Sequence, residues 1–318
     1  MASIDLTQLR KAELHAHLNG CVPSHVISEL VDLHHVVIPD GFKLPDDLII
    51  AAPVKSLLEY FRPWNVFKRL PIGKTCLATM VDEALRSLAK DGIVYAELRN
   101  SPYNISELNN ISLDESLLWL AETVEQSSAR HGIEGRIVIS FSRFRFDIER
   151  AQDLLSAIKR TNSSRRIVGL DLSGNEADPI NPEVAHLFRR AKDEMGLHVT
   201  IHAGEVGGVH NVLWAIDDCK ADRIGHALAA ATEIRLLDLL AARRICVEVC
   251  LTSNLRTGSV QRLEDHAVHH FIAHGVPFVL CADNPAVHQL SLSDEYHLFL
   301  ETTGREDLLL DMFATQMA

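Results

Sequence analysis

Residues 11–18, KAELHAHL, form the first of eight short apolar runs that are bounded by charged or turn residues. The other runs are 93–99 (IVYAELR), 136–142 (RIVISFS), 166–172 (RIVGLDL), 197–202 (LHVTIH), 222–226 (DRIGH), 245–251 (ICVEVCL) and 276–282 (VPFVLCA). Several are apolar almost throughout, which is typical of parallel strands covered on both faces. Segments with apolar residues three and four apart, as in helices, lie between most of the runs, at 80–91, 113–131, 146–161, 183–195 and 231–243.

This alternation of strands and helices predicts parallel pairing through crossover helices. Eight such units in about 300 residues fit an α/β fold of one type, the (β/α)8 TIM barrel. A doubly wound open sheet is the alternative, because a count of strands does not reveal closure, but no glycine fingerprint follows the first run. The chain has no linker, low-complexity tract or solenoid repeat, so we predict a single domain over residues 1–318.

The stretch 19–92 is too long for an ordinary connection between two strands, and it predicts helices inserted over the barrel mouth. It includes LLEYFRPWNVFKRL at 57–70, whose aromatic residues recur at helical spacing. These side chains either pack the insertion or form one wall of an apolar ligand pocket.

The charge balance excludes several classes of partner. The chain has 31 Lys and Arg against 43 Asp and Glu, a net charge of −12, which argues against nucleic acid or an anionic membrane as the main partner. No run of about 18 apolar residues and no secretion signal is present, so we expect a cytoplasmic protein. The six cysteines form no Cys-x-x-Cys pair and fit free thiols in a reducing compartment.

Histidine and aspartate side chains stand at the ends of four predicted strands. His15 and His17 end the first run and lie on one face of it, His202 and His226 end the fifth and sixth runs, and Asp283 follows the eighth. One such residue alone is usually capped or solvated, but the ends of parallel barrel strands converge on one mouth. Imidazoles with a carboxylate suit a divalent transition ion, Zn²⁺ above all, with one position left for water.

The motifs HAHLNG, HAGE, RIGHA, CLTSN, ADNP and SLSDEY occur in the order typical of the adenosine deaminase group of the amidohydrolase superfamily, which the chain resembles from residue 11 to about 296. The resemblance implies one zinc ion per chain, with the ligands His15, His17, His202 and Asp283. It also implies that Glu205 protonates the purine ring, and that His226 orients and deprotonates the zinc-bound water and stabilises the developing charge.

The resemblance further implies three substrate contacts. Gly174 would let the backbone approach the purine edge, and Asn19 and Asn284 would be polar contacts. Residues 99–101 and 252–254 (Arg99, Asn100, Ser101, Thr252, Ser253 and Asn254) follow two strands, and we expect them chiefly to shape the rim of the mouth.

Two positions depart from the adenosine-specific pattern. Many nucleoside-specific members have Asp in place of Asn19 and a second Asp in place of Asn284. The amide at 19 removes a negative charge near the ribose end of the site and repels a 5′-phosphate less, and the HAHLNG form resembles the N6-methyl-AMP deaminase branch. HAGE, however, is the adenosine-type form, so the two motifs disagree about the substrate. Asn284 can donate a hydrogen bond but cannot take up a proton as a carboxyl group can.

The sequence therefore predicts a zinc-dependent hydrolytic deaminase of purine metabolism, acting on adenosine or a close 6-aminopurine nucleoside and releasing ammonia. N6-methyl-AMP, adenine and a 5′-modified adenosine are alternative substrates. A phosphorylated substrate would need basic groups at the mouth, for which Arg62, Lys68 and Arg69 are candidates. A zinc-binding barrel without catalysis is the alternative of another class, and the sequence leaves the oligomeric state open.

Overall fold

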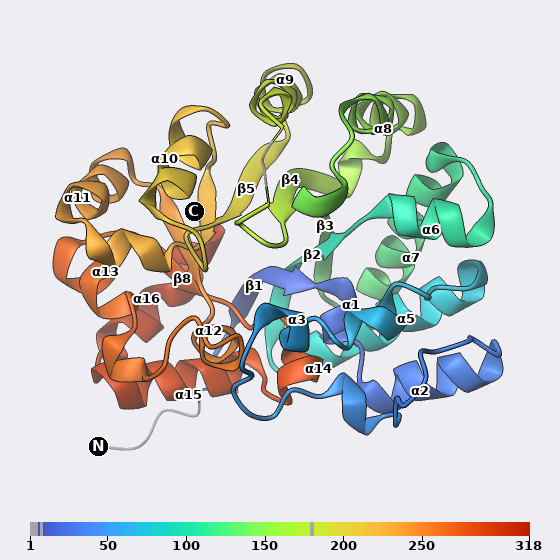
Figure 1. Ribbon diagram of the computed structural model, residues 1–318, viewed down its shortest axis with the longest axis horizontal. Helices are drawn as coiled ribbons and strands as arrows, with labels where there is room; N and C mark the ends of the chain where they lie inside the picture. The colour runs from blue at the N-terminus through green and yellow to red at the C-terminus, as the bar shows by residue number, and fades with distance from the viewer. Residues whose placement is uncertain (1–5, 7–8, 179–180) are drawn as a thin grey trace.

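The computed structural model describes residues 6, 9–178 and 181–318. Within them, eight strands pair in parallel in the order β1 to β8, and helices surround the strands (Figure 1). The strands are β1 Lys11–His17, β2 Ile93–Asn100, β3 Glu134–Ser142, β4 Ile167–Ser173, β5 His198–Ala203, β6 Arg223–His226, β7 Cys246–Val249 and β8 Phe278–Leu280. The eight apolar runs thus mark all eight strands, and no strand end differs from its run by more than two residues.

The crossover helices follow the amphipathic segments. α7 (Leu113–His131) and α9 (Glu183–Met195) coincide with their predictions, and α8 (Ile148–Thr161) and α11 (Ile234–Arg243) start two and three residues later. The predicted segment 80–91 is the second half of α5 (Gly73–Lys90). The other α-helices after β2 are α6 Pro102–Asn109, α10 Val209–Asp217, α12 Leu251–Arg256, α13 Val268–His274, α14 Pro285–His288, α15 Leu292–Thr303 and α16 Glu306–Met317.

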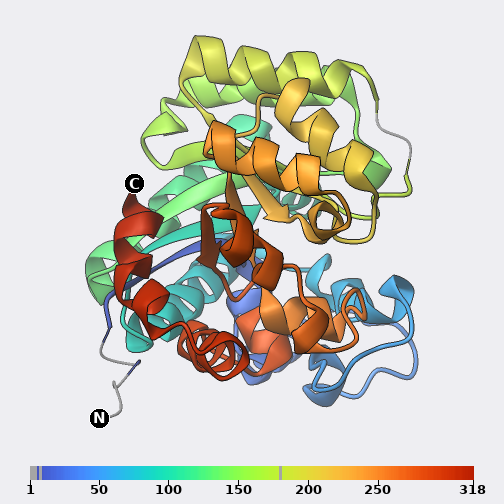
Figure 2. The same ribbon diagram turned by 90° about the vertical axis from the view of Figure 1, so that its left-hand side faces the viewer.

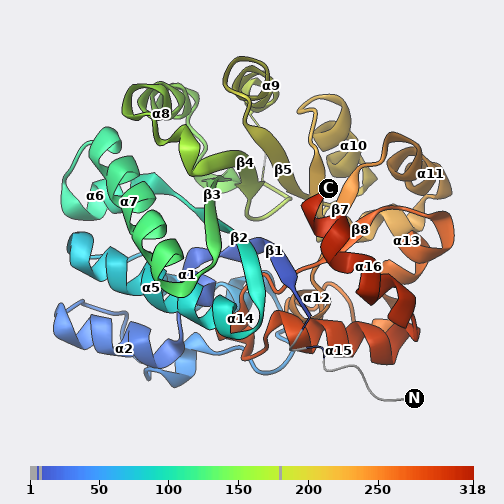
Figure 3. The ribbon, with the colours of Figure 1, turned by 180° about the vertical axis from the view of Figure 1, so that it is seen from behind.

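The insertion after β1 carries four short helices before α5, namely α1 Leu18–Cys21, α2 Ser24–Leu33, α3 Leu57–Tyr60 and α4 Trp64–Phe67. The side view shows this insertion and α16 at opposite ends of the barrel (Figure 2). From behind, α16 crosses in front of β7 and β8 (Figure 3), and the Ala12 N–H of β1 donates to Gln316 Oε1 at 2.9 Å. The C-terminal helix therefore covers the end of the barrel that faces away from the insertion.

The barrel closes between β1 and the residues that follow β8. Ala16 forms a parallel bridge with Asp283, in which the Asp283 N–H donates to His15 O and the His17 N–H donates to Asp283 O, both at 2.9 Å. Glu13 reinforces the seam, because its buried carboxylate accepts from the N–H groups of His15 and Ala282 at 2.8 Å each. The predicted (β/α)8 barrel is thus confirmed, and backbone groups of three of the expected metal ligands close it.

The described helices include none that is long and apolar enough to cross a membrane. The described cysteines are all free thiols, and all but Cys246 are buried.

The seam generates a stability prediction. Glu13→Gln replaces one acceptor oxygen by an N–H group that faces a backbone donor, so we expect a loss of about 1–3 kcal/mol of unfolding free energy. Urea denaturation followed by circular dichroism measures the change. Glu301→Gln, at an exposed position on α15, is the matched control and should change little. Equal urea midpoints for Glu13→Gln and the wild type would show that the carboxylate does not hold the seam.

Candidate active site

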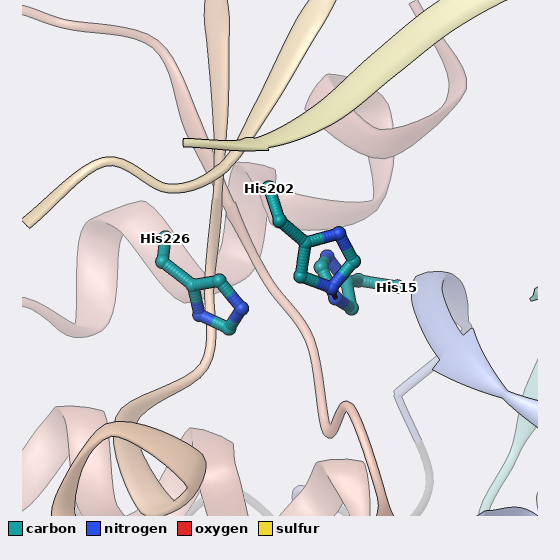
Figure 4. Close-up of side chains that lie close together, drawn as sticks. All are labelled: His15, His202 and His226. Carbon is teal, nitrogen blue, oxygen red and sulfur yellow. Dashed lines mark hydrogen bonds between the residues drawn. The ribbon is translucent and has the colours of Figure 1, made fainter. Parts of the chain in front are cut away.

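Four ligand atoms converge at the mouth of the barrel. His15 Nε2 and His17 Nε2 of β1 lie 3.0 and 3.3 Å from His202 Nε2 of β5. Asp283 Oδ1 lies 3.6 Å from His15 Nε2 and 3.3 Å from His17 Nε2. Figure 4 shows the rings of His15 and His202 meeting, with His226 of β6 beside them. The structure therefore gathers the four residues that the sequence proposed as ligands, although 268 positions separate His15 from Asp283.

Buried carboxylates orient two of these imidazoles. Glu248 Oε2 lies 2.7 Å from His15 Nδ1, and Asp171 Oδ1 lies 2.8 Å from His202 Nδ1. An imidazole that donates its Nδ1–H to a carboxylate keeps the Nε2 lone pair free for a metal ion. Sequence reasoning missed both carboxylates, although each is a single acidic residue inside an otherwise apolar run, RIVGLDL or ICVEVCL.

Arg99 lies inside the barrel, not at the rim where the sequence analysis placed it. Its side chain is fully buried, and its guanidinium lies 2.6 Å from Glu248 Oε2 and 3.5 Å from Asp171 Oδ2. The expectation failed because a charged residue at a strand end was assumed to reach solvent. Here two buried carboxylates compensate its charge, and a buried pair of this kind is costly to break.

The donor set fits a divalent cation. Asp283 Oδ1 is buried and has no hydrogen-bond partner among the described residues, whereas Oδ2 accepts from Ser253 Oγ at 2.6 Å. Burial raises the pKa of Asp283, because no solvent stabilises its charged form. The Nε2 atoms of His15 and His202 face each other at 3.0 Å. Three imidazole nitrogens and one unpartnered carboxylate oxygen at one point are donors that suit a divalent transition-metal ion.

Glu205 and His226 lie next to this cluster, with Glu205 Oε2 3.7 Å from His226 Nε2. Burial raises the pKa of Glu205 to about 7, and it lowers the pKa of His226 to about 4, with a further contribution from His202. Near neutral pH the Glu205 carboxyl therefore keeps a protonated fraction, while the His226 imidazole is neutral.

Asn254 joins these two residues. Its Nδ2 lies 3.3 Å from Glu205 Oε1 and 3.2 Å from His226 Nδ1, and its Oδ1 lies 3.1 Å from His266 Nε2. The Val268 N–H donates to His266 Nδ1 at 3.0 Å, so the neutral His266 carries its proton on Nε2 and donates it to Asn254. Asn254 then donates to His226 Nδ1, which leaves the proton of the neutral His226 on Nε2. Asn254, expected at the rim, is thus a buried link between the catalytic candidates.

Glu176 holds the turn that carries Glu205. Its carboxylate accepts from the backbone N–H groups of Gly204, Glu205 and Val206 at 2.6, 2.7 and 3.1 Å, and from Asn211 Nδ2 at 2.8 Å. Burial alone would raise the pKa of Glu176, but these hydrogen bonds hold it below its usual value. Sequence reasoning quoted this residue within VGLDLSGNE without assigning it a role, because only the fold brings it to residues 28–30 positions later.

A cavity of about 170 Å³ lies over the cluster, and we call it the catalytic cavity. Its lining comprises His17, Leu57, Tyr60, Phe61, Trp64, Ser173, Gly174, His202, Glu205, His226, Ser253, Thr257, Asp283 and Asn284. Residues of the insertion therefore form one wall of this cavity. Its aromatic residues also pack against one another, and the buried Phe67 contacts Trp64, so both interpretations of these side chains hold. Gly174 has a φ of +107°, and a Cβ there would lie 3.6 Å from Arg143 N.

The two residues predicted to make polar contacts with the substrate, Asn19 and Asn284, line different cavities. Asn284 lines the catalytic cavity, donates from Nδ2 to the Tyr60 hydroxyl at 3.2 Å and keeps a buried Oδ1 without a partner among the described residues. Asn19 lines a second cavity next to it. Lys68 also lines that second cavity, whereas Arg62 pairs with Asp47 outside both cavities.

Two residues of the site have left-handed backbone, His226 at φ +67° and Asp283 at φ +61°. Residues other than glycine rarely adopt this conformation, and it costs about 1–3 kcal/mol at each position.

Comparisons with known proteins identify the family of this chain. The sequence profile of the family described as Adenosine deaminase matches residues 10–317. The adenosine deaminase of Edwardsiella ictaluri (strain 93-146) is 33% identical over 300 residues, which cover 92% of this chain and 87% of the relative. The solved structure of the Arabidopsis N6-mAMP deaminase MAPDA has a TM-score of 0.83 at 27% identity and covers 98% of this chain and 93% of its own. Arabidopsis ADAL complexed with GMP has a TM-score of 0.84 at 27% identity, with coverages of 98% and 92%.

An amidohydrolase of Burkholderia ambifaria with bound Zn has a TM-score of 0.84 at 23% identity, covering 97% of this chain and 84% of its own, and this likeness shows the fold alone. A barrel whose mouth holds four converging ligand atoms beside a buried acid is typical of the class of metal-dependent hydrolases. Within that class, the chain belongs to the adenosine deaminase family, whose members hydrolyse C–N bonds.

The hydrogen bonds that the Glu176 carboxylate accepts, which we call the Glu176 clamp, lead to a prediction about the pH dependence of stability. Because the pKa of Glu176 is lower in the folded than in the unfolded chain, its stabilisation is complete above the unfolded value and is lost as the pH falls through the folded value. We expect Glu176→Gln to cost about 1–3 kcal/mol at pH 7 and to cost less in acid. Urea midpoints at several pH values measure this. The control is Glu183→Gln, at an exposed position at the start of α9, and a Glu176→Gln deficit that is constant with pH would contradict the charge-based clamp.

Proposed function

We propose that this chain is a zinc-dependent deaminase that hydrolyses the exocyclic amine of a 6-aminopurine nucleoside, adenosine or a close analogue, to give the 6-oxopurine and ammonia. The observation that carries the proposal is the convergence of His15, His17, His202 and Asp283. Glu205 and His226 lie beside them and line the catalytic cavity. One zinc ion per chain would be held by the first four of these residues. The ion, when bound, lowers the pKa of water and so supplies a nucleophile near neutral pH.

Glu205 is the proton donor in this proposal. Its pKa of about 7 keeps a protonated fraction at neutral pH, as a general acid needs. Delivery of its proton to a purine ring nitrogen withdraws electrons from the carbon that bears the amine and makes that carbon easier to attack. The hydrogen bonds from Asn254 and Thr257 to Glu205 Oε1 leave Oε2 toward His226 and the cavity.

His226 presents its Nε2–H to the cavity in the tautomer set by Asn254. This atom can orient the attacking water and stabilise the negative charge that develops on its oxygen. The tautomer supports these two roles. It gives Nε2 no lone pair with which to remove the water's proton, so we leave that third expected role out of the proposal.

The purine base has two contacts in the proposal. Gly174 offers backbone without a side chain at the cavity wall, and Asn284 offers an amide whose Oδ1 is unpartnered. Tyr60 of the insertion accepts a hydrogen bond from Asn284 Nδ2. The position of the insertion therefore affects the orientation of the amide that contacts the base.

The non-catalytic alternative explains less of the site. A barrel that only bound zinc would have no use for the buried acid Glu205 or for the Glu176 clamp that positions its backbone. N6-methyl-AMP stays the second candidate substrate, because the Arabidopsis relative is named as an N6-mAMP deaminase.

Glu205→Gln tests the proton donor. The amide is nearly isosteric but cannot act as an acid, so we expect kcat for ammonia release from adenosine to fall about 10²–10⁴-fold, with metal content and thermal unfolding unchanged. A coupled ammonia assay gives the rate. Glu233→Gln, which lies at the exposed start of α11, is the matched control. Full activity of Glu205→Gln would remove Glu205 from the mechanism.

Metal analysis tests the ligand set. We expect elemental analysis of the purified protein to find about one zinc per chain, since the four converging donors form one site. His17→Ala should lower both the zinc content and the activity, whereas His270→Ala, at an exposed position on α13, should change neither. Chelation that strips the metal and leaves turnover intact would refute zinc dependence.

A further inference from the structure

The second cavity at the mouth is larger than the catalytic cavity and adjoins it. Its volume is about 330 Å³ against about 170 Å³, and we call it the adjoining cavity. Trp64 of α4 lines both. Asn19 lines the adjoining cavity two residues after His17, which lines the catalytic one, and Ser142 lines it in register with Ser173. The two cavities therefore share part of their walls.

Aromatic rings form the walls of the adjoining cavity. Tyr103, Phe141 and Phe146 make one wall, with ring centroids 6.4 Å apart between the first two and 5.6 Å apart between the last two. Trp64 contributes from the insertion and is itself packed against Phe67 at 5.5 Å. These rings are already in contact with one another, so the wall exists before any ligand arrives.

The charges of the adjoining cavity balance. Glu107 and Asp147 line it together with Lys68 and Arg150. The Arg150 guanidinium lies 2.5 Å from the Glu107 carboxylate and stacks over the Tyr103 ring at 4.6 Å. Lys68 donates to the Asn65 side chain at 3.0 Å and is exposed. A phosphate is usually held by several unpaired cations, above all bidentate arginine, and this cavity offers no arginine free of a carboxylate among its described lining.

The position of the cavity indicates which part of a substrate enters it. Under the proposed function, the amine end of the purine lies against Glu205 and the metal ligands, so the sugar leaves the catalytic cavity at the opposite end of the base. The adjoining cavity, reached past Trp64 and Asn19, has about twice the volume of the catalytic one. A ribose is no larger than a purine base, and it leaves room there for a further group on C5′.

We propose that the adjoining cavity binds an uncharged aromatic or similarly bulky apolar group attached to C5′ of the 6-aminopurine nucleoside, and that this group, not a 5′-phosphate, distinguishes the preferred substrate. The inference rests on the proposed function, and it names the substrate class of the same site. Flat rings can stack between Trp64 and the wall of Tyr103 and Phe146, while the two cations and two carboxylates of the lining balance in charge.

Binding to the zinc-loaded Glu205→Gln protein tests this independently of turnover. Calorimetry would compare adenosine, AMP and 5′-deoxy-5′-(phenylthio)adenosine. We expect the phenylthio compound to bind at least tenfold more tightly than adenosine, and AMP to bind no more tightly than adenosine. Tightest binding of AMP, or equal binding of adenosine and the phenylthio compound, would overturn the proposal. Absence of ammonia release by the wild type from all three would count against the proposed function, not against the cavity.

Substitutions in the wall identify the site of binding. In the Glu205→Gln background, Phe146→Ala and Tyr103→Ala should each lower the affinity ratio of the phenylthio compound to adenosine by about five- to tenfold, the size of one lost aromatic contact. Phe144→Ala is the matched control, because Phe144 is 75% exposed and lines neither cavity. General damage to the fold would weaken the binding of both compounds, whereas loss of the aromatic wall would lower the affinity ratio. A ratio that is unchanged in both wall variants would place the aromatic group elsewhere and refute the assignment.

Discussion

The parallel bridge between Ala16 and Asp283 is the constraint on which the rest of the molecule depends. Its two backbone hydrogen bonds use the N–H of Asp283 and the carbonyl of His15, and the N–H of His17 and the carbonyl of Asp283. The same three residues supply three of the four converging ligand atoms. Closing the barrel and assembling the site are therefore a single event, because the main chains that pair at the seam carry the side chains that meet above it.

Beneath this seam lies a buried layer of charge. Arg99 sits between Glu248 and Asp171, and each carboxylate also receives an imidazole, from His15 and His202 respectively. Removal of one partner from such a layer costs about 3–5 kcal/mol, since the remaining charge stays buried without compensation. The layer stabilises the fold only when all of its charged partners are present. It also fixes the tautomers and directions of two ligands. Specificity of geometry, more than net stability, explains why the interior of this barrel is ionic.

The sequence predicted the strands better than it predicted the residues that position the site. Apolar runs marked every strand, and the ends of those runs placed His15, His202 and Asp283 at one mouth, because parallel topology alone dictates that convergence. The roles of Glu176 and Asn254 could not be read in the same way. Each acts through contacts with residues on other elements, such as the Gly204 N–H and His266, and nothing in the local sequence encodes such distant pairings. The position of Asn19 could not be predicted for the same reason, because only the packing of the insertion places it and Asn284 in different cavities.

The left-handed backbone at His226 and Asp283 has a consequence for how this protein can evolve. Replacement of either residue by glycine would relax the main chain, yet it would delete the side chain that the site needs. Selection for heat resistance alone would therefore favour inactive descendants at these two positions, whereas selection for turnover keeps the strain and must recover the lost stability elsewhere in the barrel.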